Sequence, residues 1–260
     1  MTILEKITTY KQKEVSAKKE AFPISILEQS PWFDRATTSL ASAVSASTMG
    51  IIAEHKRRSP SKPTINNSVQ VQDVAKGYET AGVSGMSVLT DTNFFGGSLD
   101  DLVLARKATS FPLLRKEFIV DLYQIYEAKA YGADAILLIA ACLTKSELKE
   151  FSALAKSLQL DVLLEVHNEE EINKSLHLTV DMLGVNNRNL KTFQTSIEIS
   201  KQLADLIPND FVKVSESGIS SVEAISELKQ YGYQGFLIGE TFMRTENPGE
   251  AAKQFINQLK

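Results

Sequence analysis

The sequence predicts an α/β fold, a single (β/α)8 TIM barrel that carries an amino-terminal helical extension. Three observations lead to this prediction. Apolar, strand-like runs recur about every 20 to 30 residues, helical patterns with similar start signals lie between them, and no linker or change in composition divides the chain. Eight such strand-then-helix units, joined by right-handed crossovers, close into a barrel. The runs lie near residues 49–53, 83–89, 111–115, 133–140, 161–165, 182–186, 211–215 and 235–239.

An open, doubly wound sheet is the alternative fold. It requires a reversal in strand order, which the sequence does not reveal, and no G-x-G-x-x-G motif follows an early strand. We therefore expect one domain over residues 1–260, with the helical extension at 1–48 and the barrel at 49–260.

Composition and charge limit the kind of protein. The chain has 260 residues, of which 43% are hydrophobic and 23% charged, as in ordinary soluble globular proteins. Its net charge of −4 gives no support to nucleic-acid binding. The single cysteine, Cys142, excludes an internal disulfide and lies in an apolar run, which favours a packed, inert thiol. We expect a cytoplasmic protein without membrane contact, because the chain has neither a long apolar span nor a hydrophobic signal core.

Helix start signals recur along the chain. In the extension, Thr2 with Glu5 has the spacing of a capping box ahead of an apolar helical stripe, and Ser25 with Glu28 repeats that spacing. This pattern fits either a cover over one end of the core or a stabilising appendage. Further cap pairs precede later helices: Thr144 with Glu147, Asn168 with Glu171, Thr195 with Glu198, and Ser220 with Glu223. Glycines suited to helix ends follow three helical stretches, at Gly82, Gly132 and Gly232.

The first strand ends in a charged loop. Glu54 and Lys56 alternate along the strand and so project to the same side, which presents an acid and a base together. Ser59 and Ser61 add hydroxyl groups directly afterwards. The basic cluster of this loop suits a small anionic ligand better than a polyanion, because the protein as a whole is acidic; it comprises Lys56, Arg57, Arg58 and Lys62.

Other strands end in the same way. The carboxyl ends of barrel strands meet at one face, so their polar residues are expected to surround one opening. The first ionisable or amide side chains after the apolar runs are Glu54, Lys56, Lys116, Glu165, Asn186, Arg188 and Glu216. The histidines at 55, 167 and 177 lack metal-ligand spacing, so we expect no metal and treat His55 as structural. Lysine and glutamate are left to perform acid–base chemistry.

Glycine-containing turns follow the last two strands. Ser217 and Gly218 follow the seventh strand, and Gly239 and Glu240 follow the eighth. Backbone amides can approach an anion closely at such turns, and barrels often bind phosphate at this location. Together with Ser59 on the opposite side, these turns predict a ligand that carries a phosphate monoester.

Several of these segments resemble one known family. Residues 52–61 read Ile-Ala-Glu-His-Lys-Arg-Arg-Ser-Pro-Ser and resemble the signature of the indole-3-glycerol-phosphate synthases of tryptophan biosynthesis. The resemblance continues over nearly the whole chain, in residues 3–7, 87–91, 95–98, 114–119, 165–167, 184–190, 215–219 and 237–243. It implies a lyase without a cofactor that acts on 1-(2-carboxyphenylamino)-1-deoxyribulose 5-phosphate. Ring closure with loss of CO2 and water would yield indole-3-glycerol phosphate.

The resemblance also implies roles for individual residues. Lys116 would be the general acid during ring closure, and Lys56 would hold the anthranilate carboxylate or donate a proton. Glu165 would transfer a proton during dehydration, with Glu54 in support. Asn186, Arg188 and Glu216 would belong to the same site, and the phosphate pocket would comprise Ser59, Ser217, Gly218, Gly239 and the backbone amide of Glu240. The extension would lie over the active-site end.

Two departures and two alternatives accompany this resemblance. His55 replaces a usually apolar residue, and Pro63 stands where glycine is common, which should stiffen the loop after the first strand. A phosphoribosylanthranilate isomerase would share the phosphate pocket but use a cysteine–aspartate pair, whereas a non-catalytic phosphate-binding barrel would have lost strand-end charges. The partner expected in every case is a small phosphorylated molecule. Binding to other tryptophan-pathway enzymes is left open.

Overall fold

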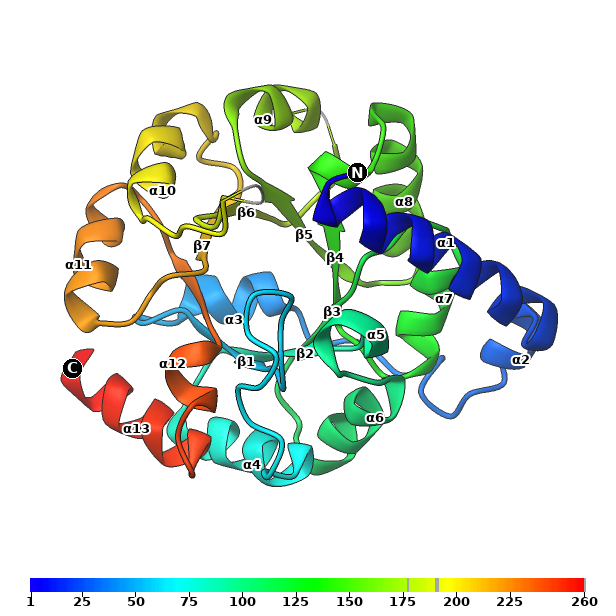
Figure 1. The fold of residues 1–260 in the computed structure, drawn as a ribbon, viewed down its shortest axis with the longest axis horizontal. Coiled ribbons are helices and arrows are strands. Elements are labelled where there is room, and N and C mark those ends of the chain that lie inside the picture. The colour runs from blue at the N-terminus through cyan, green and yellow to red at the C-terminus, as the bar shows by residue number, and fades with distance from the viewer. Residues whose placement is uncertain (177, 190–191, 260) are drawn as a thin grey trace.

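The computed structural model describes residues 1–176, 178–189 and 192–259, and within these ranges eight parallel strands close into a barrel in chain order (Figure 1). The last strand pairs with the first, with Ala53 beside Ile238, so no reversal of strand order occurs. The predicted (β/α)8 barrel is confirmed and the open sheet is excluded. The strands are β1 Ile51–His55, β2 Gly85–Leu89, β3 Leu113–Lys116, β4 Ala135–Ile139, β5 Asp161–Val166, β6 Met182–Asn186, β7 Val212–Glu216 and β8 Gly235–Ile238.

Helices surround the strands as an outer ring (Figure 1). In chain order the helices are α1 Ile3–Ala21, α2 Ile24–Leu27, α3 Leu40–Ala46, α4 Val71–Ala81, α5 Thr92–Phe95, α6 Leu99–Ala108, α7 Tyr123–Ala130, η1 Ala140–Cys142, α8 Lys145–Ser157, α9 Glu169–Ser175, α10 Glu198–Leu203, η2 Ala204–Leu206, α11 Val222–Gln230, α12 Glu240–Met243 and α13 Pro248–Leu259.

The first and third strands lie further along the chain than their apolar runs. β1 begins at Ile51 rather than 49 and extends through Glu54 and His55, while β3 includes Lys116. Charged residues can continue a barrel strand because the backbone ladder, not the side chain, makes the pairing, and the strand end faces a solvated opening. The predicted shared side of Glu54 and Lys56 follows from this register.

Three of the predicted helix caps are present. The side chains of Thr2 and Thr144 each accept a hydrogen bond from the backbone N–H three residues later. The side chains of Glu5 and Glu147 in turn accept the backbone N–H of Thr2 and Thr144, so both capping boxes are complete. Asn168 caps α9 in the same way. The helix-end glycines at 82, 132 and 232 all have the positive φ expected of them.

Three other cap predictions are wrong. Pro23 occupies the cap position of α2, two residues before the predicted cap, and Ser25 lies inside the helix. Thr195 instead forms a backbone bridge to Arg188, which keeps it extended, so α10 starts later and without a side-chain cap. The cap of α11 is Ser221 rather than Ser220, a one-residue shift between adjacent serines.

The amino-terminal end of the barrel is closed by α3. Leu40 and Val44 are fully buried and pack with the side chains inside the barrel, such as Ile52 and Leu163. Asp161 fixes the start of α3 by accepting hydrogen bonds from the Ser39 hydroxyl at 2.7 Å and from a backbone amide at 2.9 Å. In Figure 1, α3 lies behind the strands.

Asp134 is a second anchor at this closed end. It is fully buried, and its two oxygens contact Arg35 and Arg106, each at 2.7 Å. The same oxygens accept the backbone N–H groups of Thr38 and Leu113, both at 2.9 Å. The buried carboxylate is therefore saturated with charge-assisted hydrogen bonds.

The opposite end of the barrel is partly covered by α1, which lies toward the viewer in Figure 1. Lys11 of α1 is almost fully buried and contacts Glu14, Asp91 and Glu117 at 3.0–3.2 Å. Burial opposes the charge of Lys11, but these carboxylates raise its pKa above the usual value. The first turn of α1 is thereby held over the carboxyl ends of the strands.

The seam between the first and last barrel units is closed by α4 and α13. A Cβ atom at Gly77 would lie 2.8 Å from the Cα of Gly249, and one at Gly249 would lie 2.6 Å from the Cα of Gly77. Only glycine permits the two helix backbones to come so close. This contact stands directly outside the pairing of β1 with β8.

Candidate active site

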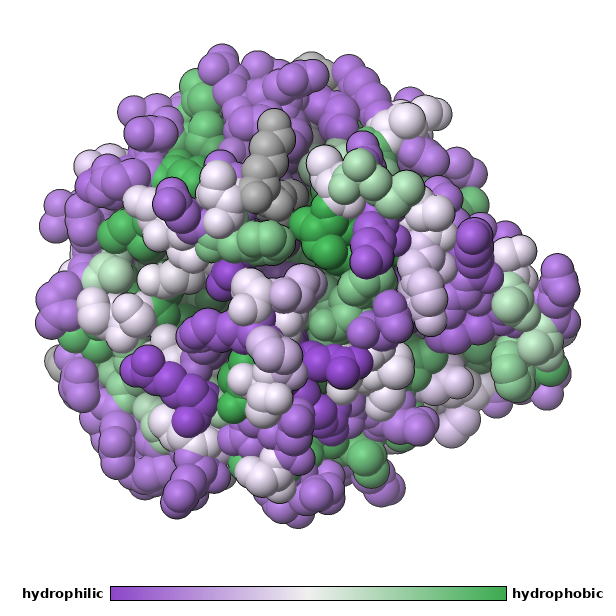
Figure 2. All heavy atoms as spheres, in the orientation of Figure 1, coloured by the Kyte–Doolittle hydropathy of each residue, from purple (hydrophilic) through white to green (hydrophobic). Residues whose placement is uncertain are grey.

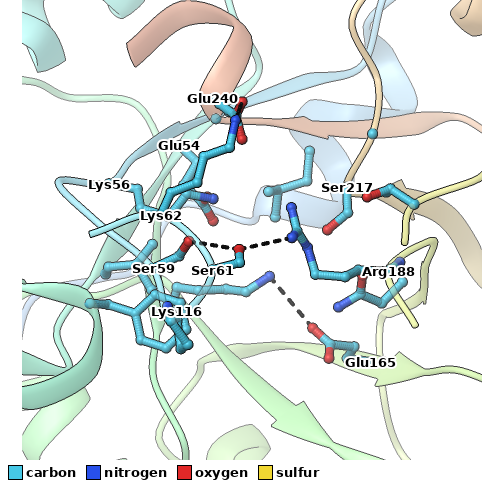
Figure 3. A pocket seen from close by; sticks show the side chains of 18 of the residues that line it. Glu54, Lys56, Ser59, Ser61, Lys62, Lys116, Glu165, Arg188, Ser217 and Glu240 are labelled. Atoms are coloured by element: carbon cyan, nitrogen blue, oxygen red, sulfur yellow. Dashed lines mark hydrogen bonds and ion pairs between the residues drawn. The ribbon is translucent and has the colours of Figure 1, made fainter. Parts of the chain in front are cut away.

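A cavity of about 550 Å³ opens at the carboxyl ends of the strands. Figure 2 shows a hollow near the middle of this face, with apolar residues beside it and a hydrophilic surface around it. Of the site residues named from the sequence, all but Glu216 line this cavity: Glu54, Lys56, Ser59, Lys116, Glu165, Asn186, Arg188, Ser217, Gly218, Gly239 and Glu240. Segments from six strand ends thus contribute to one opening (Figure 3).

Lys116 occupies the centre of the charged group. Its ammonium group donates a short hydrogen bond to Glu216 and lies 3.6 Å from Glu165 Oε2 (Figure 3). β3, β5 and β7 supply the three residues, each at or near a strand end. Glu216 lies behind the cavity wall, where it contacts Lys116.

Burial and charge set the ionisation of this triad. Burial first, and then the nearby Glu165 and Glu54, raise the pKa of Glu216 to about 7, although Lys116 opposes the shift. Burial disfavours the charged form of Lys116, but Glu216, Glu165 and Glu54 raise its pKa above the usual value. One oxygen of Glu216, Oε1, is buried without a hydrogen-bond partner. The triad therefore holds a protonated lysine and a carboxyl group close to its titration point.

A second acid–base pair lies on β1. Lys56 Nζ is 2.6 Å from Glu54 Oε1, as the alternation along the strand predicts. Burial opposes ionisation of Glu54, yet Lys56 and Lys116 lower its pKa below the usual value. Glu54 is consequently a carboxylate at neutral pH, and it balances two lysines.

The turn after β7 has the backbone of an anion cradle. Ser217 and Gly218 both have positive φ, 70° and 75°. A turn of this kind can direct successive backbone N–H groups toward one concave side. The carbonyl of Ser217 accepts a hydrogen bond of 3.0 Å from buried Asn187, which fixes the turn. Ser59 lies across the opening (Figure 3).

The loop after β1 is tied to its neighbours. Arg188 donates to the Ser61 hydroxyl at 3.1 Å, and Lys62 pairs with Glu240. Arg57 forms an ion pair with Asp101, and its second nitrogen lies 2.8 Å from the other carboxylate oxygen. Arg57 and Arg58 line no part of the cavity among the described residues, whereas Lys56 and Lys62 do. Only part of the basic cluster is therefore available to an anionic ligand.

Some polar residues singled out in the sequence have structural positions. His55 is buried on the helix-facing side of β1, and burial first, then Arg57, lowers its pKa to about 4, so it is neutral at pH 7. Cys142 is half-buried, and burial raises the pKa of its thiol. His177 lies outside the described residues. No group of three metal-ligating side chains occurs in the described part of the chain.

Apolar cavity residues were not identified from the sequence. Phe95 and Phe118 form one side, and the first turn of α1 adds Ile3, Leu4 and Ile7. The family resemblance implied that the extension lies over the active-site end, but the helical stripe of residues 3–7 did not show which of its side chains enter the cavity. Thr241 and Arg244 also line the cavity, and no sequence signal identified them.

The described helices include none that is long and apolar enough to cross a membrane. In solved structures the same fold occurs in KGPDC from Streptococcus mutans, with a TM-score of 0.62 and 13% identity over 81% of this chain and 96% of the other. A mutant tryptophan synthase α-subunit from Pyrococcus furiosus has a TM-score of 0.61 and 14% identity, over 81% of this chain and 97% of the other. At such identities these similarities concern the fold alone.

Sequence comparisons are more specific. A family model described as indole-3-glycerol phosphate synthase matches residues 4–255. The protein of that name from Bacteroides thetaiotaomicron is 46% identical and covers 99% of both chains. The protein from Legionella pneumophila is 42% identical, over 98% of both chains. The one from Polaromonas sp. is 41% identical, over 97% of both chains. The resemblance seen in the motifs is thus confirmed over the full length, and the chain belongs to the indole-3-glycerol phosphate synthase family of decarboxylating lyases.

Proposed function

We propose that the described cavity is where this chain catalyses the reaction of its family. The reaction converts 1-(2-carboxyphenylamino)-1-deoxyribulose 5-phosphate to indole-3-glycerol phosphate by ring closure, decarboxylation and dehydration. The observation that supports this assignment best is Lys116, held between Glu165 and Glu216 in a cavity that also contains an anion cradle. The chemistry needs a proton donor, a proton acceptor and a distant anchor, and these groups supply them.

Lys116 is the general acid in this proposal. When the aromatic carbon attacks the carbonyl carbon, negative charge develops on the carbonyl oxygen. A protonated lysine can place a proton on that oxygen as the carbon–carbon bond forms. Its raised pKa keeps the ammonium protonated before the reaction, and the apolar side of the cavity strengthens its field.

The remaining charges have complementary tasks. Lys56 binds the anthranilate carboxylate until it leaves as CO2, and Glu54 holds Lys56 in position at 2.6 Å. Glu165 lines the cavity and accepts a proton during the loss of water that makes the ring aromatic. Glu216 holds Lys116 from behind, and Asn186 lies at the end of β6, where it can donate a hydrogen bond to the substrate.

The phosphate occupies the cradle between the β7 and β8 turns and the loop after β1. Ser217 and Gly218 offer backbone N–H groups there, while Gly239, the amide of Glu240 and the Ser59 hydroxyl complete the pocket. Arg188 adds positive charge on the same side. Binding of the remote phosphate orients the reacting carbons without taking part in bond making. The aromatic ring packs against Phe118 and the first turn of α1.

The other functions considered fit the cavity less well. An isomerase of this pathway would need a reactive cysteine, yet Cys142 has a raised pKa and is absent from the described cavity wall. A non-catalytic barrel has no use for a protonated lysine between two buried carboxylates. We further propose that residues 1–260 act as one cytoplasmic domain whose ligand is a small phosphorylated molecule, with neither nucleic acid nor membrane as a partner.

The direct test is product formation. Purified protein is incubated with the carboxyphenylamino sugar phosphate, and indole-3-glycerol phosphate is followed by its indole fluorescence. The Lys116→Met variant is the negative control, and Lys107→Met, which removes an exposed lysine of α6, is the matched positive control. Absence of product from the wild-type protein, with its circular dichroism intact, would refute the proposed function.

A further inference from the structure

An imidazole lies directly behind Glu165, outside the cavity. His167 follows Glu165 by two positions and so projects to the same side of the chain. Its Nε2 lies 3.4 Å from Glu165 Oε1, while the other oxygen of Glu165 lies 3.6 Å from Lys116. Glu165 is therefore contacted by one basic group on each of its oxygens. His167 itself is not among the described residues that line the cavity.

The other ring nitrogen is held just as specifically. His167 Nδ1 is 3.2 Å from Glu171 Oε2, which also accepts the backbone N–H of His167 at 2.9 Å. The second oxygen of Glu171 accepts the amide of Asn168 at 2.8 Å, and Asn168 in turn caps α9 by accepting the Glu171 N–H. The start of α9 thus fixes Glu171, and Glu171 fixes the plane of the ring.

The ring has a carboxylate oxygen near each nitrogen: Glu171 Oε2 is hydrogen-bonded to Nδ1, and Glu165 Oε1 lies within ion-pair distance of Nε2, which is buried without a hydrogen bond. Burial opposes its charge, but the hydrogen bond to Glu171 and the charges of Glu165, Glu171 and Glu216 raise the pKa of His167. These three glutamates are the charged groups that face the ring, from β5, α9 and β7. Cys142 in η1 and Lys174 in α9 complete the surroundings of Glu165 and Glu171.

We propose that Glu171 and His167 are positioning residues for Glu165. The α9 turn holds the imidazole ring, and the ring lies beside one oxygen of Glu165 so that the other oxygen points at Lys116 and the cavity. This inference rests on the proposed proton-transfer role of Glu165, and it assigns no contact between His167 and the substrate.

Steady-state kinetics of His167→Gln and Glu171→Gln test the proposal. Glutamine at 167 can still donate a hydrogen bond but carries no charge. We expect His167→Gln to lower kcat about tenfold, a part of the roughly 10²- to 10⁴-fold that a well-positioned proton acceptor contributes, with less than a twofold change in KM. The double variant loses no more than His167→Gln alone, since the two residues act through one contact.

Glu169→Gln is the matched control, because it removes the same charge from the first turn of α9 at an exposed position. It should have wild-type kinetics. A kcat of His167→Gln within twofold of wild type would overturn the proposal, as would a loss that appears in KM instead of kcat or is shared by Glu169→Gln. Wild-type protein without product would instead overturn the proposed function itself, so the two failures are distinguishable.

A measurement on folded wild-type protein covers the case in which His167→Gln does not fold. Side-chain ¹⁵N spectra of the histidines should show one ring whose titration midpoint lies above the usual value near 6.5. In Glu171→Gln this midpoint falls by about one unit or more, because the ring loses one of its carboxylates. A midpoint at or below 6.5 in the wild-type protein, or one that Glu171→Gln leaves unchanged, would overturn the proposal.

Discussion

The two ends of this barrel both bury charged groups, but they differ in how completely those groups are hydrogen-bonded. At the end closed by α3, Asp134 has two arginine contacts and two backbone donors, and Asp161 has a serine hydroxyl and an amide. At the open end, Glu216 has a buried oxygen without a partner, and Lys116 faces the cavity.

This difference indicates what each set of charges does. A buried charge that is fully hydrogen-bonded fixes one geometry and stabilises it, whereas one that is partly satisfied is available to a ligand at a cost in stability. The closed end is therefore expected to govern stability, and the open end to govern turnover. The following four variants separate these two contributions.

Lys116→Met should have the largest effect. Methionine keeps the length of the side chain but cannot donate a proton, so kcat should fall by about 10³-fold or more. The melting temperature should change little, because Glu216, whose pKa is already about 7, can take up a proton when its positive partner is removed. Product formation and thermal unfolding measure the two quantities, and a kcat within tenfold of wild type would exclude Lys116 as the general acid.

Asp134→Asn should have the second largest effect, and this effect should be on stability. The substitution leaves Arg106 without its buried counter-charge, which is expected to lower the free energy of unfolding by about 3 kcal/mol. Urea denaturation measures this loss. At a temperature where the variant is fully folded, kcat should match the wild type; a large fall in kcat there would contradict the separation of the two ends.

Glu216→Gln should change how stability depends on pH. The folded-state pKa of about 7 lies above the ordinary 4.5, so protonated Glu216 contributes stability below pH 4.5 that is lost as the pH rises toward 7. The variant lacks this loss. Its free energy of unfolding relative to wild type should therefore rise between these pH values, by on the order of 2 kcal/mol. Urea melts at several pH values measure the difference, and parallel curves would contradict the assigned shift.

Gly218→Val should have the smallest effect, confined to substrate binding. Position 218 has a φ of 75°, and a Cβ atom there would lie 2.6 Å from Thr195 Cγ2. The turn must shift, and its amides then no longer converge on the phosphate. We expect KM to rise about tenfold, equivalent to one lost hydrogen bond to a charged group, with a smaller change in kcat. An unchanged KM would place the phosphate elsewhere.

Much of the fold follows from local patterns. The apolar runs located every strand, and the cap pairs located three helix starts, because burial and backbone capping act over a few residues. The errors at Thr195 and Ser25 have a longer-range cause: a bridge to Arg188 holds Thr195 extended, and Pro23 shifts the start of α2. Neither effect is contained in the spacing of a cap pair.

The charged residues at the carboxyl ends of the strands were predictable from the same strand pattern that predicted the barrel. Once parallel strands share a direction, their polar ends must meet, and this placed Lys116 and Glu165 beside one cavity. The resemblance placed the extension over the active-site end, but the contacts that hold α1 there were not predictable, because Lys11 reaches Asp91 and Glu117 across 80 and 106 residues of sequence. The carboxylate–imidazole unit of His167 and Glu171 was hidden for another reason, since its spacing is that of an ordinary helix start.

The glycine contact between α4 and α13 also bears on how the protein is made. During synthesis β1 emerges first, yet its second neighbour, β8, and the covering α13 emerge about 180 residues later. At translation speeds of about 5–20 residues per second, the nascent chain leaves an open strand edge exposed for roughly 10 to 40 s. The protein therefore depends on its ribosome-bound intermediate remaining unaggregated until the last unit docks. A bulkier residue at Gly77 or Gly249 would prolong that interval rather than alter the chemistry at the opposite end.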